Sequence, residues 1–245
     1  MKLSFVIPAY NEEAYIGKCL GSIERELRGA RYDAEVIVVN NASTDRTKTI
    51  AKGFAGVRIV DEPTKGIVWA RRAGLRAAAG ELIANIDADA VLPRGWLANV
   101  LREFEKNPAL ICLSGPHMYY DLSKSARFFV AVFYGLGFLF YLLNRFVLRI
   151  GSLVQGGNFV VKRWALERIG GYDTTINFYG EDTDIARRLH TIGPVKFTFG
   201  LPIYISGRRL AREGILRTGL RYAINFFWVT FRKRPFDTTS TDIRP

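Results

Sequence analysis

The feature that most constrains the fold is a regular alternation, in the first half of the chain, of short apolar runs with stretches of helical pattern. The apolar runs have the length of buried strands, and the stretches between them place apolar residues on one helical face. The expected strands are residues 3–8, 35–39, 57–60 and 82–86, and the expected helices are residues 11–28, 44–52, 67–79 and a helix with Pro93 in its first turn. This order predicts an α/β fold with a Rossmann-like, mostly parallel sheet covered by helices on both faces.

The length of 245 residues suits one large domain, and no linker or internal repeat divides it. We expect a single domain over residues 1–235 and a flexible polar tail over 236–245. No signal-peptide pattern opens the chain, and Cys19 and Cys112 have no partner at metal-ligand spacing. We therefore expect a cytoplasmic protein without disulfides or a structural zinc site.

Polar side chains follow three of the four expected strands, at the point where each strand ends. The three polar segments are residues 8–12 (Pro-Ala-Tyr-Asn-Glu), residues 40–45 (Asn-Asn-Ala-Ser-Thr-Asp) and residues 87–89 (Asp-Ala-Asp). Ligands of such sheets bind at the carboxyl ends of the strands. These three segments are therefore expected to form one site.

Asp87 and Asp89 are one residue apart in an extended segment, so their side chains point to opposite sides. A hard divalent cation such as Mg²⁺ or Mn²⁺, held by one or two carboxylates, takes its other ligands from water and substrate phosphates. An isolated pair of this kind is usually a pair of solvated turn carboxylates. Here the pair follows a buried strand on a polar rim, which favours a cation that holds a diphosphate.

A second acidic cluster lies at residues 178–184 (Phe-Tyr-Gly-Glu-Asp-Thr-Asp), before a helical pattern that stops at Gly193-Pro194. The helix dipole stabilises carboxylates in the first turn as anions, which suits a general base. Helix capping accounts for one of the three acids, and Asp184 is the residue that we assign to it.

Residues 6–13, residues 38–45, the triplet at 87–89 and Gly180-Glu181-Asp182 together resemble the motifs of family 2 glycosyltransferases. The resemblance covers residues 3–209. It implies the glycosyltransferase A fold and an inverting transfer of sugar from a nucleotide-diphosphate sugar to an acceptor hydroxyl. It also implies Asp182 as the base that deprotonates the acceptor, with Glu181 shaping the acceptor pocket.

Further site residues follow from the same resemblance. Those implied for the nucleotide sugar are Pro8, Ala9, Tyr10, Glu12, Asn40, Arg71, Asp87 and Asp89, with Asp87 toward the ribose and Asp89 on the metal. The position of Asn40 normally carries an Asp that accepts a hydrogen bond from the base, and an Asn oxygen can also accept one. Gly157 and Asn158 match the acceptor-side loop. Arg208 and Arg209 fall where relatives place basic residues near the diphosphate, and surface charge is the alternative for both.

The resemblance divides the domain into a nucleotide-sugar half and an acceptor half. The expected parts are residues 1–115 for the donor, residues 116–207 for the acceptor with an apolar insertion at 124–150, and residues 208–235 as basic interfacial helices.

The net charge of +12 is concentrated in two apolar, aromatic segments. Residues 208–234 carry eight Lys or Arg and one Glu, and residues 124–149 carry four Lys or Arg and no acid. Basic charge beside apolar and aromatic residues favours an anionic membrane surface over nucleic acid as a partner. We therefore expect a protein bound to the inner face of the cell membrane, acting on a sugar or lipid-linked acceptor.

The uncharged run at residues 128–143 would form a helix of about 24 Å, shorter than the ~30 Å hydrocarbon core. A single crossing would also separate Asp89 from Asp182. The run is therefore interpreted as a monotopic or re-entrant hairpin broken near Gly135 or Gly137, with a buried core helix as the alternative. Residues 215–231 have the composition of an interfacial helix.

Other functional classes fit the sequence less well. A sugar nucleotidyltransferase requires a Gly-rich, basic loop after the first strand, and residues 8–12 contain neither feature. An NAD-type dehydrogenase requires a G-x-G-x-x-G segment after a strand, which the sequence lacks. A non-catalytic, membrane-associated nucleotide-sugar-binding protein remains an alternative, although it has no need of a base at Asp182.

Overall fold

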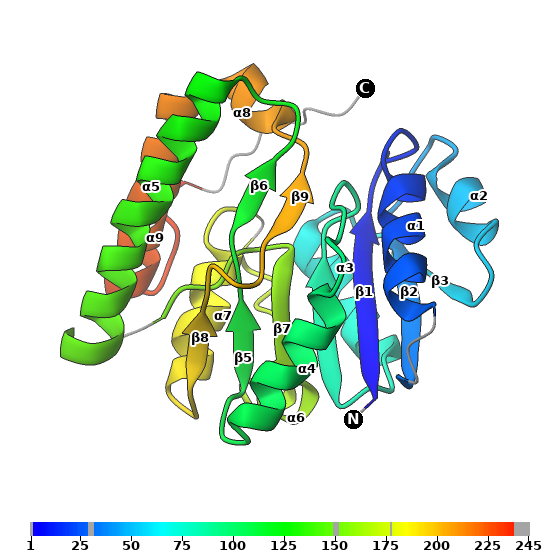
Figure 1. Ribbon diagram of the computed structural model, residues 1–245, viewed down its shortest axis with the longest axis horizontal. Helices are drawn as coiled ribbons and strands as arrows, with labels where there is room; N and C mark the ends of the chain where they lie inside the picture. Colours follow the sequence, from blue (N-terminus) through cyan, green and yellow to red (C-terminus); the bar gives the residue numbers. More distant parts are fainter. Residues whose placement is uncertain (1, 29–31, 149–151, 177, 238–245) are drawn as a thin grey trace.

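The computed structural model describes residues 2–28, 32–148, 152–176 and 178–237, and the chain forms an α/β fold (Figure 1). The main sheet has the strand order β3-β2-β1-β4-β7-β5-β8. Its strands are β1 (Leu3–Ala9), β2 (Ala34–Asn40), β3 (Val57–Asp61), β4 (Leu82–Ile86), β5 (Cys112–Ser114), β7 (Asn158–Lys162) and β8 (Val195–Phe197). A small second sheet pairs β6 (His117–Tyr119) with β9 (Ile203–Ile205).

The main sheet is mostly parallel, as the sequence predicts. Strand β1 pairs in parallel with β2 and with β4, and β2 pairs in parallel with β3. Strand β7 runs antiparallel between β4 and β5, with Ile86 opposite Asn158. The start of β7 therefore lies beside the carboxyl end of β4, which brings Gly157 to Asp87.

Helices cover both faces of the sheet. The α-helices of the described residues are α1 (Ile16–Leu27), α2 (Thr47–Lys52), α3 (Ile67–Ala77), α4 (Trp96–Lys106), α5 (Lys124–Leu142), α6 (Arg163–Arg168), α7 (Glu181–His190), α8 (Arg208–Glu213) and α9 (Ile215–Arg232). Side chains of Phe5 and Ile7 join α1 and α4 in one apolar core, whereas Val6 joins α3 and α7 in the other. This alternation follows from the two-residue period of a strand buried on both faces.

Three helices begin later than the sequence predicts, and one of them, α2, expected from residue 44, begins at Thr47. Helix α1 begins at Ile16, because Asn11 has a left-handed φ of 49° and its side chain accepts a hydrogen bond from the Thr44 N–H at 2.9 Å. Helix α4 begins at Trp96, so Pro93 lies in a turn whose carbonyl accepts from the Trp96 N–H at 3.2 Å. Loop contacts at the rim thus replace the first turn of α1.

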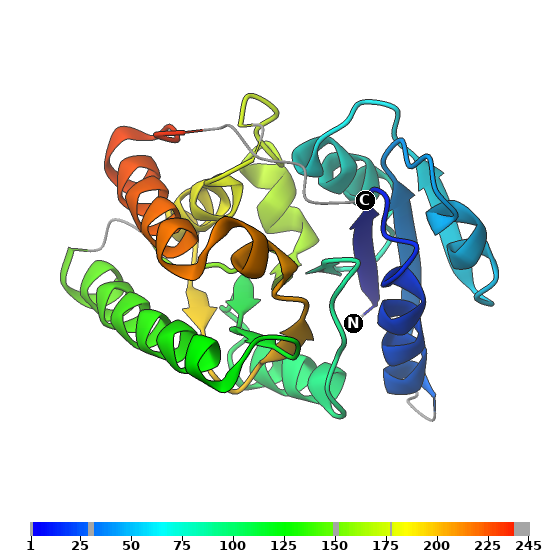
Figure 2. The same cartoon turned by 90° about the horizontal axis from the view of Figure 1, so that it is seen from above.

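The apolar insertion is one unbroken helix, and the hairpin predicted near Gly135 or Gly137 is wrong. Helix α5 continues through both glycines and passes into a π-helical segment at Leu143–Leu148. Residues 149–150 of the predicted insertion, and 238–245 of the predicted tail, lie outside the described residues. Helices α5 and α9 lie side by side at the end of the molecule opposite β3 (Figures 1 and 2).

Candidate active site

The loops after β1 and β2 are joined by hydrogen bonds from backbone to side chain. The Glu12 N–H donates to Oγ1 of Thr47 at 2.7 Å, and the Asn11 N–H donates to Oγ of Ser43 at 3.2 Å. Pro8 and Ala9 are the last two residues of β1, directly before this loop, and they pair with Val39 and Asn40 of β2. The predicted nucleotide-binding segment is therefore a fixed edge of the sheet.

Tyr10 lies at this edge under a lysine from the loop before α3. Nζ of Lys65 donates to the Tyr10 hydroxyl at 2.7 Å and lies 4.4 Å from the centre of the ring. An aromatic ring with a basic residue beside it can stack on a nucleobase or bind a phosphate.

Asn40, at the end of β2, presents a hydrogen-bond acceptor that has no partner among the described residues. Its Nδ2 donates to Oδ1 of Asp61 at 2.8 Å, and Lys48 in turn donates to Oδ2 of Asp61 at 2.7 Å. Because an ionised carboxylate only accepts, this contact fixes the amide with nitrogen toward Asp61. The opposite atom, Oδ1, is buried and without a hydrogen-bond partner.

Asp87 lies directly against the glycine pair that precedes β7. Gly157 has a φ of 75°, and a Cβ at this position would lie 2.1 Å from the carboxyl carbon of Asp87. The Asp87 N–H also donates to the Gly157 carbonyl at 3.3 Å. Only glycine therefore allows this close approach.

Arg71 joins Asp87 to the second acidic cluster. Its side chain is 2% exposed, with Nη2 3.5 Å from Oδ1 of Asp87 and Nη1 3.3 Å from Oε1 of Glu181. Asp87 and Glu181 are 94 positions apart in the sequence, and one buried guanidinium holds them in the same site. The prediction that Arg71 belongs to the site agrees with this placement.

Asp182 lies in the first turn of α7 and accepts two backbone hydrogen bonds. The Gly156 N–H donates to Oδ2 at 3.1 Å, and the Thr183 N–H donates to Oδ1 at 2.7 Å. Gly156 thus contacts Asp182, while Gly157 contacts Asp87. The two acidic clusters lie on either side of a single glycine pair.

Burial has the largest effect on the pKa values of Glu181 and Asp182. Burial raises the pKa of Glu181 above its ordinary value, and the neighbouring charge of Asp182 raises it further. Burial also raises the pKa of Asp182, while the hydrogen bonds from Gly156 and Thr183 limit the rise. A carboxylate with a raised pKa is a stronger base than a solvated one, which suits proton abstraction from a hydroxyl.

Asp89 lies beside Glu12 and is contacted by Arg208, the first residue of α8. Nη2 of Arg208 is 3.1 Å from Oδ2 of Asp89 and 2.5 Å from Oε1 of Glu12. Burial, with the charges of Glu12 and Asp87, raises the pKa of Asp89 to about 7, although Arg208 opposes the rise. The guanidinium of Arg208 also lies over the ring of Tyr15, 4.5 Å from its centre.

A divalent cation fits this place through substrate phosphates and not through a protein cage. Within the described residues, no three His, Cys, Asp or Glu side chains gather in an arrangement that would hold a metal ion. Asp89 supplies hard carboxylate oxygens, and a cation held by so few carboxylates takes phosphate and water as its other ligands. The guanidinium of Arg208 between Asp89 and Glu12 marks a position where positive charge is favourable.

Comparison with known proteins assigns the family. Residues 4–170 match the family model described as glycosyl transferase family 2, which is more than half of the chain. The chain belongs to glycosyltransferase family 2.

Curated relatives share the family match over part of their length. The chain is 30% identical over 132 residues to the uncharacterized glycosyltransferase EpsJ of Bacillus subtilis, covering 52% of this chain and 37% of that protein. It is 32% identical over 149 residues to the dolichyl-phosphate beta-glucosyltransferase ALG5D of Trichomonas vaginalis, covering 55% of this chain and 46% of that protein. The chain therefore spans less than half the length of these two relatives.

Solved structures share the fold of this family 2 chain. The mannosyltransferase of Pyrobaculum calidifontis, in complex with GDP-Man and Mn²⁺, has a TM-score of 0.71 at 23% identity, over 98% of this chain and 66% of that one. The glucosyl-3-phosphoglycerate synthase of Mycobacterium tuberculosis, in complex with Mn²⁺, UDP-Glc and phosphoglyceric acid, has a TM-score of 0.63 at 20% identity, over 94% of this chain and 79% of that one. The glycosyltransferase A fold predicted from the sequence is confirmed.

The structure of this family 2 chain brings most of the predicted site residues to one edge of the sheet. Arg209 does not join them, because its guanidinium pairs with Glu213 at 2.9 Å and lies over the ring of Phe178. The side chain of Asn158 is fully buried and donates to the carbonyls of Pro116 and Leu201, so it holds the acceptor-side loop in place. Its predicted contact with an acceptor stays a prediction.

Sequence reasoning missed Tyr134 and His117, which contact the segment of the glycine pair. The Tyr134 hydroxyl on α5 accepts from the His117 N–H at 3.1 Å and donates to Oε1 of Gln155 at 3.0 Å. A single histidine and an apolar helix carry no sequence signal for this contact. Asp121 anchors the segment before Arg208 through hydrogen bonds from Ser206 and Gly207, both at 2.6 Å, and also went unpredicted.

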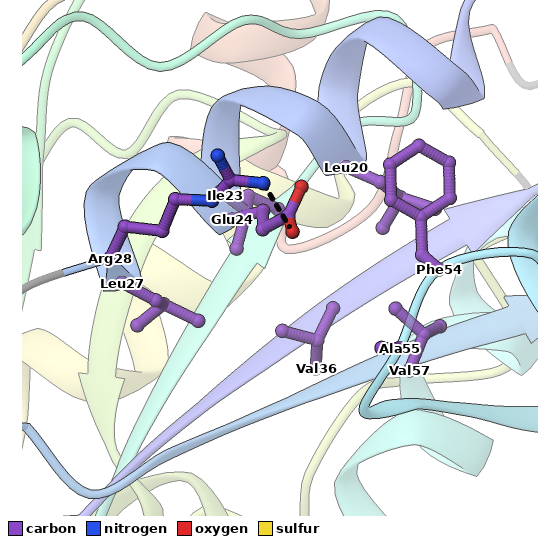
Figure 3. A pocket seen from close by; sticks show the side chains of 9 residues that line it. All are labelled: Leu20, Ile23, Glu24, Leu27, Arg28, Val36, Phe54, Ala55 and Val57. Carbon is purple, nitrogen blue, oxygen red and sulfur yellow. Dashed lines mark hydrogen bonds and ion pairs between the residues drawn. The ribbon is translucent and has the colours of Figure 1, made fainter.

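A cavity of about 250 Å³ lies elsewhere, between α1 and the outer strands β2 and β3 (Figure 3). Its lining is mostly apolar and contains a hydrogen-bonded pair, Arg28 and Glu24, at 2.9 Å. None of the residues of the candidate site lines it.

Proposed function

We propose that the chain is an inverting, cation-dependent glycosyltransferase that moves a sugar from a nucleotide-diphosphate sugar to an acceptor hydroxyl. One observation carries the proposal: the Gly156-Gly157 pair places Asp182 on one side and Asp87 on the other. The donor-binding carboxylates and a buried base therefore face one reaction centre. A protein that only binds a nucleotide sugar has no use for the base.

In the proposed reaction, Asp182 accepts the proton of the acceptor hydroxyl while the acceptor oxygen attacks the anomeric carbon. The bond from that carbon to the diphosphate oxygen breaks, and the diphosphate leaves from the opposite face with its electron pair. A bound Mg²⁺ or Mn²⁺ would offset the charge of the leaving diphosphate. Asp89 would hold the cation, and Arg208, whose Nη2 lies 3.1 Å from Oδ2 of Asp89, would contact phosphate oxygens.

A panel of nucleotide sugars with Mn²⁺ or Mg²⁺ tests the reaction class directly. Purified protein is expected to gain thermal stability with one class of nucleotide sugar and to hydrolyse it slowly without an acceptor. A protein that gains no stability with any member of the panel would contradict the proposal.

The attachment to a membrane surface is a second part of the proposal, and helix α5 supports it. By length and composition, Lys124–Arg145 could cross a membrane, and only 11% of its apolar stretch is buried. One face packs on the domain through Tyr141 and Phe138, whose ring lies 5.1 Å from Phe199. The exposed side chains of this helix include Phe128, Phe129, Val132, Leu136 and Leu139. The alternative of a buried core helix does not fit this exposure.

Helix α9 adds basic charge to the same end of the molecule. It contacts α5 through Phe227, whose ring lies 5.1 Å from that of Phe140. Leu216 is 80% exposed and Leu220 is 62% exposed, and Arg217 lies exposed between them. Apolar side chains with adjacent arginines suit an anionic interface. We therefore propose peripheral attachment to the cytoplasmic face of the cell membrane and a sugar or lipid-linked acceptor.

A further inference from the structure

His117 is a buried side chain beside the reaction centre that the reaction proposed above does not use. It is 6% exposed, and its Nε2 atom has no hydrogen-bond partner among the described residues. A buried polar atom without a partner destabilises the folded state, so an unpaired buried nitrogen next to a substrate site indicates a ligand contact.

Hydrogen bonds fix the backbone of residues 115–117 against the segment that contains the glycine pair. The Gly115 N–H donates to the Asn158 carbonyl at 3.4 Å, and Nδ2 of Asn158 donates to the Pro116 carbonyl at 3.2 Å. The His117 N–H reaches Gln155 through the Tyr134 hydroxyl. The ring itself packs edge-to-face on Tyr119 at 6.2 Å. His117 is thus held next to residues 155–158, which separate Asp87 from Asp182.

The chemistry of the ring is that of a neutral hydrogen-bonding group. Burial lowers the pKa of His117 to about 4, even though the charge of Asp87 and a contact with the Gly156 backbone favour the protonated form. A neutral imidazole offers one donor and one acceptor. Asn158 on the same segment also has a buried Oδ1 without a hydrogen-bond partner. A neutral imidazole suits a hydroxyl group, which both donates and accepts.

We propose that His117 is a specificity-determining residue that hydrogen-bonds, through Nε2, to a hydroxyl of the sugar being transferred. This inference rests on the proposed function. The transferred sugar is favoured over the acceptor because the charge of Asp87, which lies against Gly157 on the donor side of the glycine pair, acts on His117.

The test compares a nucleotide sugar with its nucleoside diphosphate, because only the former carries the sugar. Titration calorimetry with Mn²⁺ gives the Kd of UDP-glucose, UDP, GDP-mannose and GDP. In His117→Ala and His117→Asn, the Kd of the sugar nucleotide is expected to rise about 3- to 10-fold while that of the diphosphate is unchanged. His117→Gln, whose amide reaches the place of Nε2, is expected to recover most of the affinity.

The chain has one other histidine, His190 on α7, and His190→Gln serves as the matched control with no expected change. If the His117 variants lower both affinities equally, or neither, His117 binds an ordered water or only supports the fold, and the inference is overturned. If the wild-type protein binds neither the nucleoside diphosphate nor the nucleotide sugar, both the proposed function and this inference fail.

Discussion

Arg208 lies with Nη2 3.1 Å from Oδ2 of Asp89, so a protein cation contacts the carboxylate that we assign to the metal. Arg208→Ala removes this charge and leaves Asp89 and Glu12 close together. We expect the variant to bind Mn²⁺ more tightly without nucleotide, and to bind the nucleoside diphosphate about tenfold more weakly because a charge-assisted contact is lost. Calorimetry measures both affinities.

Arg209→Ala is the matched control for Arg208, since Arg209 pairs with Glu213 and not with the site. It should leave both affinities unchanged. Equal effects of the two substitutions would mean that Arg208 acts only through the overall positive charge of the protein and not through its contact with Asp89.

The buried acid pair predicts a dependence of stability on pH. The pKa of Glu181 is raised by burial above its ordinary 4.5, so the folded state binds this proton more tightly than the unfolded state. The stabilising contribution is present below 4.5 and is lost as the pH rises through the raised pKa of the folded state. Glu181→Gln should therefore lose less Tm between pH 5 and pH 8 than the wild type does.

Asp182 and Asp89 also have raised pKa values, so part of the pH dependence should remain in Glu181→Gln. Scanning calorimetry across the pH range makes the comparison. If the pH profile of Tm in Glu181→Gln were identical to that of the wild type, protonation of Glu181 would not stabilise the folded state.

The Asn40–Asp61 contact predicts which bases are accepted. With Nδ2 held by Asp61, Asn40 presents an acceptor, which can accept the ring N–H that uracil and guanine carry and that cytosine and adenine lack. We expect UDP or GDP to bind about 3- to 10-fold more tightly than CDP and ADP. Methylation of UDP at N3 should remove the advantage of UDP.

Asp61→Asn tests the orientation of the amide, because an asparagine at 61 can donate to Oδ1 of Asn40 and release Nδ2. This variant should discriminate less among the bases. Equal binding of all four diphosphates by the wild type would refute this role of Asn40.

The exposed apolar side chains of α9 predict vesicle binding. Leu216→Ser combined with Leu220→Ser should weaken binding to anionic vesicles about tenfold or more, because each leucine loses apolar burial at the interface. Trp164→Ser, at an exposed apolar position on α6, is the control and should bind normally. Sedimentation with vesicles measures the effect. Failure of the wild-type protein to sediment with anionic vesicles at low salt would rule out this attachment.

The sequence predicts the donor half of the site well because its physical signals are local. Apolar runs such as residues 82–86 are fully buried strands, and each polar segment follows such a strand directly. The start of α1 was misplaced because Asn11 is fixed by contacts with the next loop, which lie 33 positions away. The hairpin in α5 was wrong because glycine lowers helix propensity without preventing a helix.

The acceptor side was harder to predict because long-range pairing builds it. Strand β7 inserts antiparallel between β4 and β5, and this placement, not a motif, brings Gly156 to Asp182 and Gly157 to Asp87. His117 and Tyr134 reach the same place from β6 and α5. No local pattern encodes those contacts.

Turnover by Asp182→Asn tests whether Asp182 takes the proton of the acceptor hydroxyl. The measurement is the release of nucleoside diphosphate from the nucleotide sugar with acceptor present, beside Asp173→Asn, an exposed aspartate outside the site, as the control. We expect kcat to fall by about 10²–10⁴ in Asp182→Asn while Tm and the Kd of the nucleotide sugar stay near those of the wild type. Wild-type turnover in that variant would contradict it.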